Sequence, residues 1–181
     1  SAKYIAYDLK GLFPATYKEL LLLKGVGTYT AAAIASFAFD LPHAVVDGNV
    51  YRVLSRVFGI KDAIDSTQGK KTFKSLANEL LGKENPGAYN QAIIDFGAIQ
   101  CTPKLPNCTD CPFNDCCYAF LNNQVDLFPI KSKKIKKRTR YFNYLVLNNN
   151  DQVFIRKRTH KDVWQSLYEF PMIESDSLLS L

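Results

Sequence analysis

The chain of 181 residues has no apolar run that approaches the roughly 20 residues needed to cross a bilayer. Its opening stretch, SAKYIAYDLK, has neither the basic start nor the apolar core of a secretory signal peptide. No internal repeat is found. Four of its five cysteines are clustered like metal ligands, which is typical of a reducing compartment. We therefore expect an intracellular, cytoplasmic protein.

Acidic residues are absent from residues 131–140, which hold seven Lys or Arg. The net charge of the chain is +6, and without this stretch it would be −1. One interpretation of such a run is a solvated linker. The other is a strap that faces phosphate groups and adds salt-dependent affinity for nucleic acid. The two interpretations are compatible.

The first part of the chain, residues 1–126, predicts a mainly helical domain. Its apolar content is adequate for a core, because 47% of the chain is hydrophobic and 13% aromatic. Thr16 and Glu19 have the spacing of a capping box, and Gly59 follows an apolar pattern with helical period as a terminator. The expected helices cover residues 1–10, 16–24, 28–39, 48–58, 66–81 and 87–100.

The pattern changes after residue 126. Residues 127–140 are basic, contain a proline and predict a linker. β-Branched and aromatic residues then predict a hairpin. Its strands would be residues 141–148 and 152–158, joined by Asn149-Asn150-Asp151. Only about forty residues follow the linker, too few for an independent mixed domain, so residues 141–181 are interpreted as the beginning of a second domain.

Four cysteines form the most informative pattern: Cys101, Cys108, Cys111 and Cys117, spaced C-x6-C-x2-C-x5-C. Short loops with prolines at 103, 106 and 112 let the backbone curl around one metal centre. Four thiolates suit tetrahedral zinc as well as an iron–sulfur cluster. Structural zinc sites favour two close pairs, and this stretch has one, so the spacing leaves the two options about even. Cys116 breaks the spacing and is not expected to bind metal.

A turn between two expected helices provides a candidate phosphate site. Gly25-Val26-Gly27 permits a tight turn, and the following helix begins with unpaired backbone N–H groups. A lone G-x-G is a weak signal, since it also suits an ordinary turn. Placed between a leucine-rich helix and a T-A-A-A helix, it predicts a helix-hairpin-helix, which grips DNA backbone without reading sequence. The expected contacts are Lys24, Gly25, Val26, Gly27 and Thr28.

Asp47 precedes an expected helix in the stretch Val46-Asp47-Gly48-Asn49. Its simplest role is a helix N-cap, worth about 1 kcal/mol. A helix N-terminus also favours an ionised carboxylate. Such an anion can stabilise an oxocarbenium-like transition state, as carboxylates do in glycoside hydrolysis.

Hairpin, aspartate and cysteines, in this order and spacing, resemble the HhH-GPD superfamily of DNA glycosylases, closely over residues 1–126 and more loosely beyond. In that superfamily the cysteine pattern holds a 4Fe–4S cluster, so the resemblance implies this cofactor. Endonuclease III-like members carry a nucleophilic lysine where this chain has Tyr29, and commonly read V-D-T-H where it reads V-D-G-N. Both positions are similar to the adenine DNA glycosylase (MutY) branch, which removes adenine mispaired with 8-oxoguanine.

Two further stretches resemble that branch. Tyr89-Asn90-Gln91-Ala92 is similar to its F-N-Q-A stretch, whose glutamine contacts the flipped adenine. Without the family, Gln91 would be an ordinary polar helix residue. Residues 164–171 (WQSLYEFP) are similar to the W-x-G-L-Y-E-F-P motif of the branch's Nudix-like C-terminal domain, with Ser166 in place of the glycine.

The resemblance implies a mainly α fold: a helix-hairpin-helix glycosylase domain at residues 1–126 with a cluster loop at 101–117, then the start of an α/β Nudix-like domain at 141–181. It implies an adenine-specific DNA glycosylase of base excision repair, acting near nucleoid DNA on adenine opposite 8-oxoguanine or guanine. Asp47 would stabilise or capture the oxocarbenium ion, and Tyr29 and Asn49 would support it.

The chain also departs from the family pattern. The general-acid glutamate of the family lies in a helix upstream of everything present here, and its 8-oxoguanine loop lies beyond residue 181. We therefore interpret the chain as a fragment that is inactive alone. The apolar faces of residues 28–39 and 48–58 would be exposed or covered by a partner, including a second copy. The alternatives are a bifunctional glycosylase and lyase of the endonuclease III kind, which Tyr29 opposes, and a DNA-binding module without activity.

Overall fold

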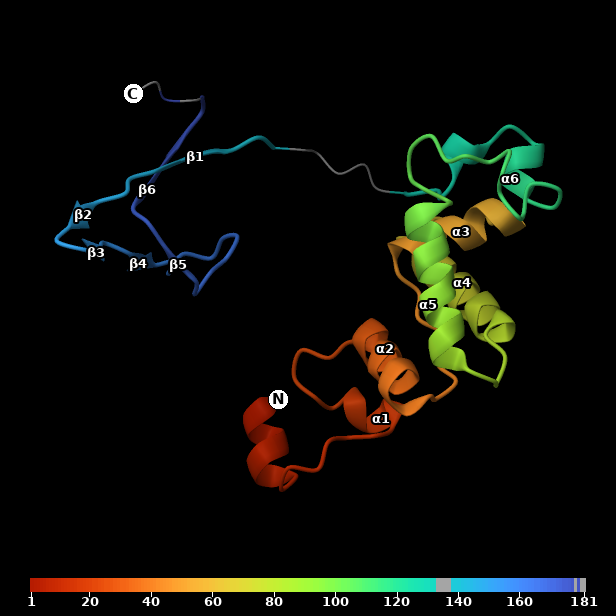
Figure 1. The fold of residues 1–181 in the computed structure, drawn as a ribbon, viewed down its shortest axis with the longest axis horizontal. Coiled ribbons are helices and arrows are strands. Elements are labelled where there is room, and N and C mark those ends of the chain that lie inside the picture. Colours follow the sequence, from red (N-terminus) through yellow and green to blue (C-terminus); the bar gives the residue numbers. More distant parts are fainter. Residues whose placement is uncertain (133–137, 178, 180–181) are drawn as a thin grey trace. The chain divides into compact units, whose positions relative to one another are not determined.

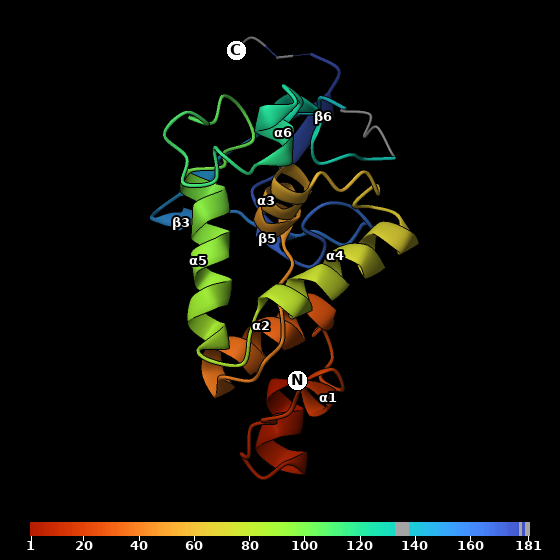
Figure 2. The same ribbon diagram turned by 90° about the vertical axis from the view of Figure 1, so that its right-hand side faces the viewer.

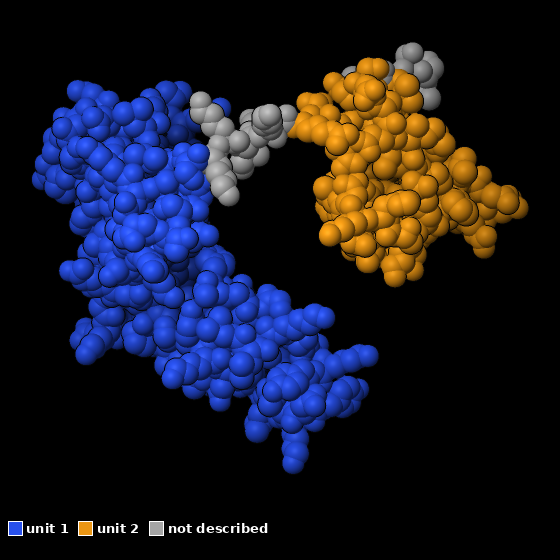
Figure 3. Space-filling model, turned by 180° about the vertical axis from the view of Figure 1, so that it is seen from behind, with its two compact units in different colours: residues 1–134 blue, residues 135–181 orange. Residues whose placement is uncertain are grey.

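The computed structural model describes residues 1–132, 138–177 and 179. The chain divides into two compact units, residues 1–134 and residues 135–181, which Figure 3 colours separately. Each unit is therefore described by itself. Within the described residues, no helix is long and apolar enough to cross a membrane.

Unit 1 is helical, which confirms the expected fold class (Figure 1). Its elements are a π-helical turn at Tyr4–Asp8, α1 (Tyr17–Leu20), α2 (Thr28–Phe39), α3 (Gly48–Phe58), α4 (Thr67–Leu80), α5 (Pro86–Ile99), α6 (Tyr118–Leu121) and a 3-10 turn at Val125–Leu127. The helix expected at residues 16–24 is shorter than predicted, because turns replace it after Leu20.

Local signals set the helix ends. The Thr16 hydroxyl accepts a hydrogen bond from the Glu19 N–H, and the Glu19 carboxylate accepts one from the Thr16 N–H, so the expected capping box is present at α1. These bonds to Thr16 also hold the pKa of Glu19 below its usual value. Gly59 ends α3 with φ +66, a left-handed conformation that glycine adopts without strain.

Helix α3 contacts α4, α5 and α6. Helix α5 packs across it, and α2 packs against another part of α5 (Figures 1 and 2). Val50, Val53 and Leu54 of α3 are each at most 4% exposed. The expectation that α3 would present an exposed apolar face is therefore wrong, because α4 and α5 cover it. In α2, Ala31, Ala32 and Ala35 are buried and Phe37 is exposed.

Unit 2 consists of short antiparallel strands. The pairs are β1 (Tyr141–Tyr144) with β6 (Met172–Ser175), β2 (Asn148–Asn149) with β3 (Gln152–Val153), and β4 (Arg156–Lys157) with β5 (Tyr168–Glu169).

The long hairpin predicted for residues 141–158 is thus wrong in extent: only β2 and β3 form it. Charge pairs lie beside the other two strand pairs. The Arg140 guanidinium donates to Glu174 and Asp162 with N–O distances of 2.6–2.8 Å, next to the β1–β6 pair. These hydrogen bonds, first that to Glu174, raise the pKa of Arg140. Beside the β4–β5 pair, Arg158 forms an ion pair with Glu169.

The predicted linker begins inside unit 1. The side chain of Phe128 is 4% exposed, and the Ile64 N–H donates to the Ile130 carbonyl over 3.0 Å. The Ser132 N–H donates to the Asp65 carboxylate over 2.8 Å. Residues 128–132 are therefore attached to the loop between α3 and α4. Residues 133–137, half of the basic run, lie outside the described residues.

Candidate nucleic-acid and cysteine sites

The hairpin joins α1 to α2 and is open to an approaching ligand. Gly25 has φ +88, where any other residue would be strained, while Gly27 has an extended backbone with φ −91 and ψ −178. A Cβ added to either glycine would meet no atom within 4 Å. Gly27 caps α2 without a side-chain acceptor, so Thr28 and Tyr29 stand in a first turn whose N–H groups lack a capping side chain. This geometry suits a phosphate group.

Asp47 caps α3 and has both carboxylate oxygens bound. One oxygen accepts from the Val50 N–H over 2.8 Å, and the other accepts from the Asn49 side-chain amide over 3.0 Å. The carboxylate is half-buried at the positive end of the helix dipole, which stabilises negative charge there. Asp47 therefore has the expected capping role, and the hydrogen bond from Asn49 also fixes the orientation of its carboxylate.

Arg52 connects Asn49 to the cysteine loop. Its guanidinium donates to the Asn49 side-chain oxygen over 2.8 Å, to the Cys101 carbonyl over 2.7 Å and to the Gly97 carbonyl over 2.5 Å. Asn49 in turn donates to Asp47. A continuous chain of hydrogen bonds therefore runs from the backbone of the first cysteine to the candidate catalytic carboxylate.

Gly97 lets α5 approach the N-terminus of α3. A Cβ at this position would lie 2.7 Å from the Asn49 Cβ and 3.2 Å from its backbone. Sequence reasoning missed both Arg52 and Gly97. The available signal was an arginine, Arg52, in the middle of a helix rich in buried apolar residues, since such a charge needs polar partners.

Tyr29 and Gln91 lie apart from this network. Tyr29 is half-exposed in the first turn of α2, and the Gln91 amide donates to the Asp95 carboxylate over 2.8 Å on the exposed face of α5. Within the described part of the chain, no hydrogen bond joins either side chain to Asp47. In the described residues, a hydrogen bond therefore joins Asp47 to Asn49 but to neither of the other two predicted residues.

The four predicted ligands face one small cavity, together with Arg56 of α3. Cys101, Cys108, Cys111 and Cys117 line it and are free thiols. Cys116 is exposed, is not among its lining residues and has its sulfur 3.7 Å from the Phe113 carbonyl. Burial raises the pKa of the Cys108 thiol, and the other three cysteines of the cavity raise it further. The four predicted ligands thus line one cavity, and Cys116 is outside its lining.

The spacing of these thiols bears on the group they suit. In the stretches that the structure describes, no three His, Cys, Asp or Glu side chains come close enough to hold one metal ion. A cluster of several iron and sulfide ions spreads its thiolate ligands more widely than a single ion does. Four thiols that line one cavity are a donor set that an iron–sulfur cluster accepts, as tetrahedral zinc also does.

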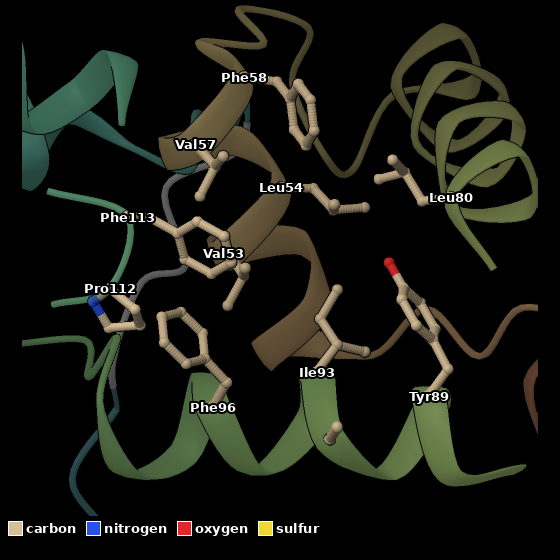
Figure 4. Close-up of a pocket in the computed structure, with 11 residues that line it drawn as sticks. Val53, Leu54, Val57, Phe58, Leu80, Tyr89, Ile93, Phe96, Pro112 and Phe113 are labelled. Atoms are coloured by element: carbon tan, nitrogen blue, oxygen red, sulfur yellow. The ribbon is translucent and has the colours of Figure 1, made fainter. Parts of the chain in front are cut away.

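A larger cavity of about 440 Å³ lies beside the cysteine loop (Figure 4). It is lined almost entirely by apolar side chains from α3, α4, α5 and the loop: Val53, Leu54, Val57, Phe58, Leu80, Tyr89, Ala92, Ile93, Phe96, Pro112 and Phe113. None of these can serve as a carboxylate or a nucleophile near Asp47. We assign this cavity no part in the chemistry.

Comparisons with known proteins agree with this geometry. The helix-hairpin-helix motif matches residues 8–37. Adenine DNA glycosylase of Buchnera aphidicola subsp. Baizongia pistaciae is 35% identical over 99% of this chain and 51% of its own length. Adenine DNA glycosylase of Homo sapiens is 44% identical over 65% of this chain and 22% of its own length. The chain spans about half the length of the Buchnera relatives it matches.

Solved structures show the same fold. A thermostable thymine-DNA glycosylase has a TM-score of 0.61 and 33% identity, covering 67% of this chain and 55% of its own. An endonuclease III in a non-covalent DNA complex has a TM-score of 0.56 and 28% identity over the same shares. With the hairpin, the capped aspartate and the cysteine cavity, these likenesses show that the chain belongs to the adenine DNA glycosylase family of the HhH-GPD superfamily.

Proposed function

We propose that the protein is a DNA glycosylase of base excision repair that hydrolyses the N-glycosidic bond of adenine mispaired with 8-oxoguanine or guanine. The observation that carries this proposal is the Asp47 carboxylate, bound by the Val50 N–H and the Asn49 amide at the N-terminus of α3. The family relationship supports the substrate class, since the curated relatives are named adenine DNA glycosylases.

Several residues of this chain have a role in the proposed reaction. The hairpin amides at Gly25–Thr28 hold the DNA backbone, and adenine leaves the base stack because its glycosidic bond is inaccessible in duplex. As that bond breaks, the sugar becomes an oxocarbenium ion, which the Asp47 carboxylate stabilises or captures. Asn49 keeps the carboxylate oriented. Gln91 contacts the extruded adenine after its side-chain amide gives up the hydrogen bond to Asp95.

Tyr29 argues against the lyase alternative. Strand cleavage by the endonuclease III route needs an amine that forms a Schiff base with the sugar, and a tyrosine cannot form one. We therefore expect release of adenine, capture of water and an intact strand with an abasic site.

The test is a single-turnover assay on a duplex with adenine opposite 8-oxoguanine or guanine. Two proteins are compared: residues 1–181 alone, and residues 1–181 joined to the part of the Buchnera relative that they do not span. We expect adenine release from the second and none from the first, with strand breaks only after added base. Strand cleavage without base would favour the bifunctional reading, and no release from the joined protein would leave only DNA binding.

We propose that Cys101, Cys108, Cys111 and Cys117 hold a 4Fe–4S cluster, whose chemistry here is to cross-link the loop and to carry a redox-active charge. Cys116→Ser should retain about four iron and four sulfide per chain, because Cys116 is not among the residues that line the cavity. The matched change Cys111→Ser should lose most of the iron. Iron and sulfide analysis checks both, and one equivalent of zinc without iron would contradict the cluster.

Backbone binding by the hairpin predicts the effect of Gly27→Val. A side chain fits at Gly27 without touching the protein, so the variant should fold normally. It should nevertheless block the approach of a phosphate group. The affinity for every duplex should fall by about tenfold, or about 1.4 kcal/mol, and should depend less steeply on salt concentration. Ala38→Val, on an exposed position of the same helix, is the control. Titrations on two unrelated sequences decide: a loss confined to one sequence would argue for base reading instead.

A further inference from the structure

The Arg56 side chain donates hydrogen bonds to the beginning of the cysteine loop. Its side chain is buried, with only 2% of the residue exposed. The guanidinium donates to the Cys101 sulfur over 3.4 Å, to the Thr102 carbonyl over 2.7 Å and to the Pro103 carbonyl over 3.3 Å. At the other end of the loop, the Cys117 sulfur lies 3.4 Å from the Arg56 carbonyl.

The same guanidinium also donates hydrogen bonds to a second segment, residues 125–128. Its Nε donates to the Val125 carbonyl over 3.1 Å and to the Phe128 carbonyl over 3.3 Å. This segment continues to Ile130, whose carbonyl accepts the Ile64 N–H. One buried side chain therefore joins the loop that carries the cysteines to the segment by which the backbone leaves the helices of unit 1.

The charge of Arg56 has no carboxylate partner among the residues that the structure describes. Its acceptors are backbone carbonyls and one sulfur, and Arg52 adds a second positive charge one turn away on α3. A buried cation without a nearby anion is costly. Four thiolates around a metal centre provide the missing negative charge, whereas neutral thiols do not.

We propose that Arg56 is a positioning residue that couples the group held by the cysteines to the docking of residues 125–130. The inference rests on the proposed cluster. With the site filled, negative charge holds the guanidinium against the Cys101 sulfur, and its Nε then holds the Val125 and Phe128 carbonyls. With the site empty, the guanidinium loses its counter-charge and both segments loosen. The N–H···S bond to Cys101 also raises the reduction potential of the bound cluster, because hydrogen bonds to sulfur stabilise the added electron.

The test measures hydrogen exchange in the full chain, with the cluster present and after its removal by oxidation and chelation. The Ile64 amide reports docking, since it donates to Ile130. We expect its exchange to rise by about tenfold or more when the cluster is removed from the unmodified protein. In Arg56→Gln the exchange should already be fast with the cluster bound, and removal should add little, because coupled effects are not additive. Lys61→Gln, which removes an exposed charge, is the control.

A second readout separates coupling from mere loss of structure. The reduction potential of the cluster should fall in Arg56→Gln and be partly restored in Arg56→Lys, which keeps the charge. Reciprocity provides a further variant if Arg56→Gln does not fold: Phe128→Leu loosens the segment and should speed iron loss to a chelator. Equal Ile64 exchange with and without the cluster, or additive effects of cluster removal and Arg56→Gln, would overturn the coupling. If the proposed function were wrong, the iron content or the rate of adenine release would show it, and these are measured independently of the Ile64 exchange.

Discussion

In residues 1–181 joined to the rest of the Buchnera relative, Asp47→Asn is expected to lower adenine release by about a thousandfold, equivalent to about 4 kcal/mol of barrier. The substitution keeps the size of the side chain and removes its negative charge. Asparagine is as good an N-cap as aspartate, so its side-chain oxygen can still accept from the Val50 N–H, as Asp47 does over 2.8 Å. Duplex binding should be unchanged, because the hairpin is untouched. Single-turnover release and titration of the same duplex measure the two effects.

The control addresses the simpler role of Asp47 as a cap. Ser66 caps α4 in the same manner, accepting from the Gly69 N–H over 2.9 Å. Ser66→Ala should lower the free energy of unfolding by about 1 kcal/mol and leave the rate of adenine release nearly unchanged. If Asp47→Asn turned over like the unmodified protein, Asp47 would be a cap and no more, and the catalytic proposal would fail.

Helix positions could be predicted because the signals that end a helix are local. Asp47 and Gly59 bound α3 at the predicted residues, and the predicted bounds of residues 28–39 also match α2. The cysteine ligands could be grouped because short loops restrict where their thiols can go. In each case the residues that decide the structure lie within one short stretch of the sequence.

What could not be predicted depends on partners distant in sequence. Arg56 binds carbonyls at 102–103 and 125–128, and a carbonyl gives no sign of its partner in the sequence. Strand pairing failed for the same reason, since β1 pairs with β6 about thirty residues away, where Arg140 meets Glu174. The roles predicted for Tyr29 and Gln91 stay predictions, because they depend on a bound base.

Gly97→Ala is expected to have the second-largest effect. In an ordinary helix this change is stabilising, because alanine favours helix by up to about 1 kcal/mol over glycine. Here the new methyl group would lie 2.7 Å from the Asn49 Cβ and 3.2 Å from the Asn49 backbone, so α5 must move away from α3. We expect the free energy of unfolding to fall by about 1–3 kcal/mol, as in other overpacked cores.

The same displacement should reach the catalytic carboxylate, because the Gly97 carbonyl accepts from Arg52, which holds Asn49 and through it Asp47. Adenine release by the joined protein should fall by about tenfold to a hundredfold, since a misplacement of about 1 Å costs that much, while duplex affinity is retained. Gly87→Ala, in the same helix, is the matched control: its Cβ would lie 3.1 Å from the Ser36 carbonyl oxygen and 3.7 Å from atoms of Phe37 and Asp40, and none of its three nearest atoms belongs to Asn49. Urea unfolding and single-turnover rates of both variants test the pathway. If Gly97→Ala lost stability but kept its rate, close packing at Asn49 would support the fold alone, and the route from Arg52 to Asp47 would have no part in catalysis.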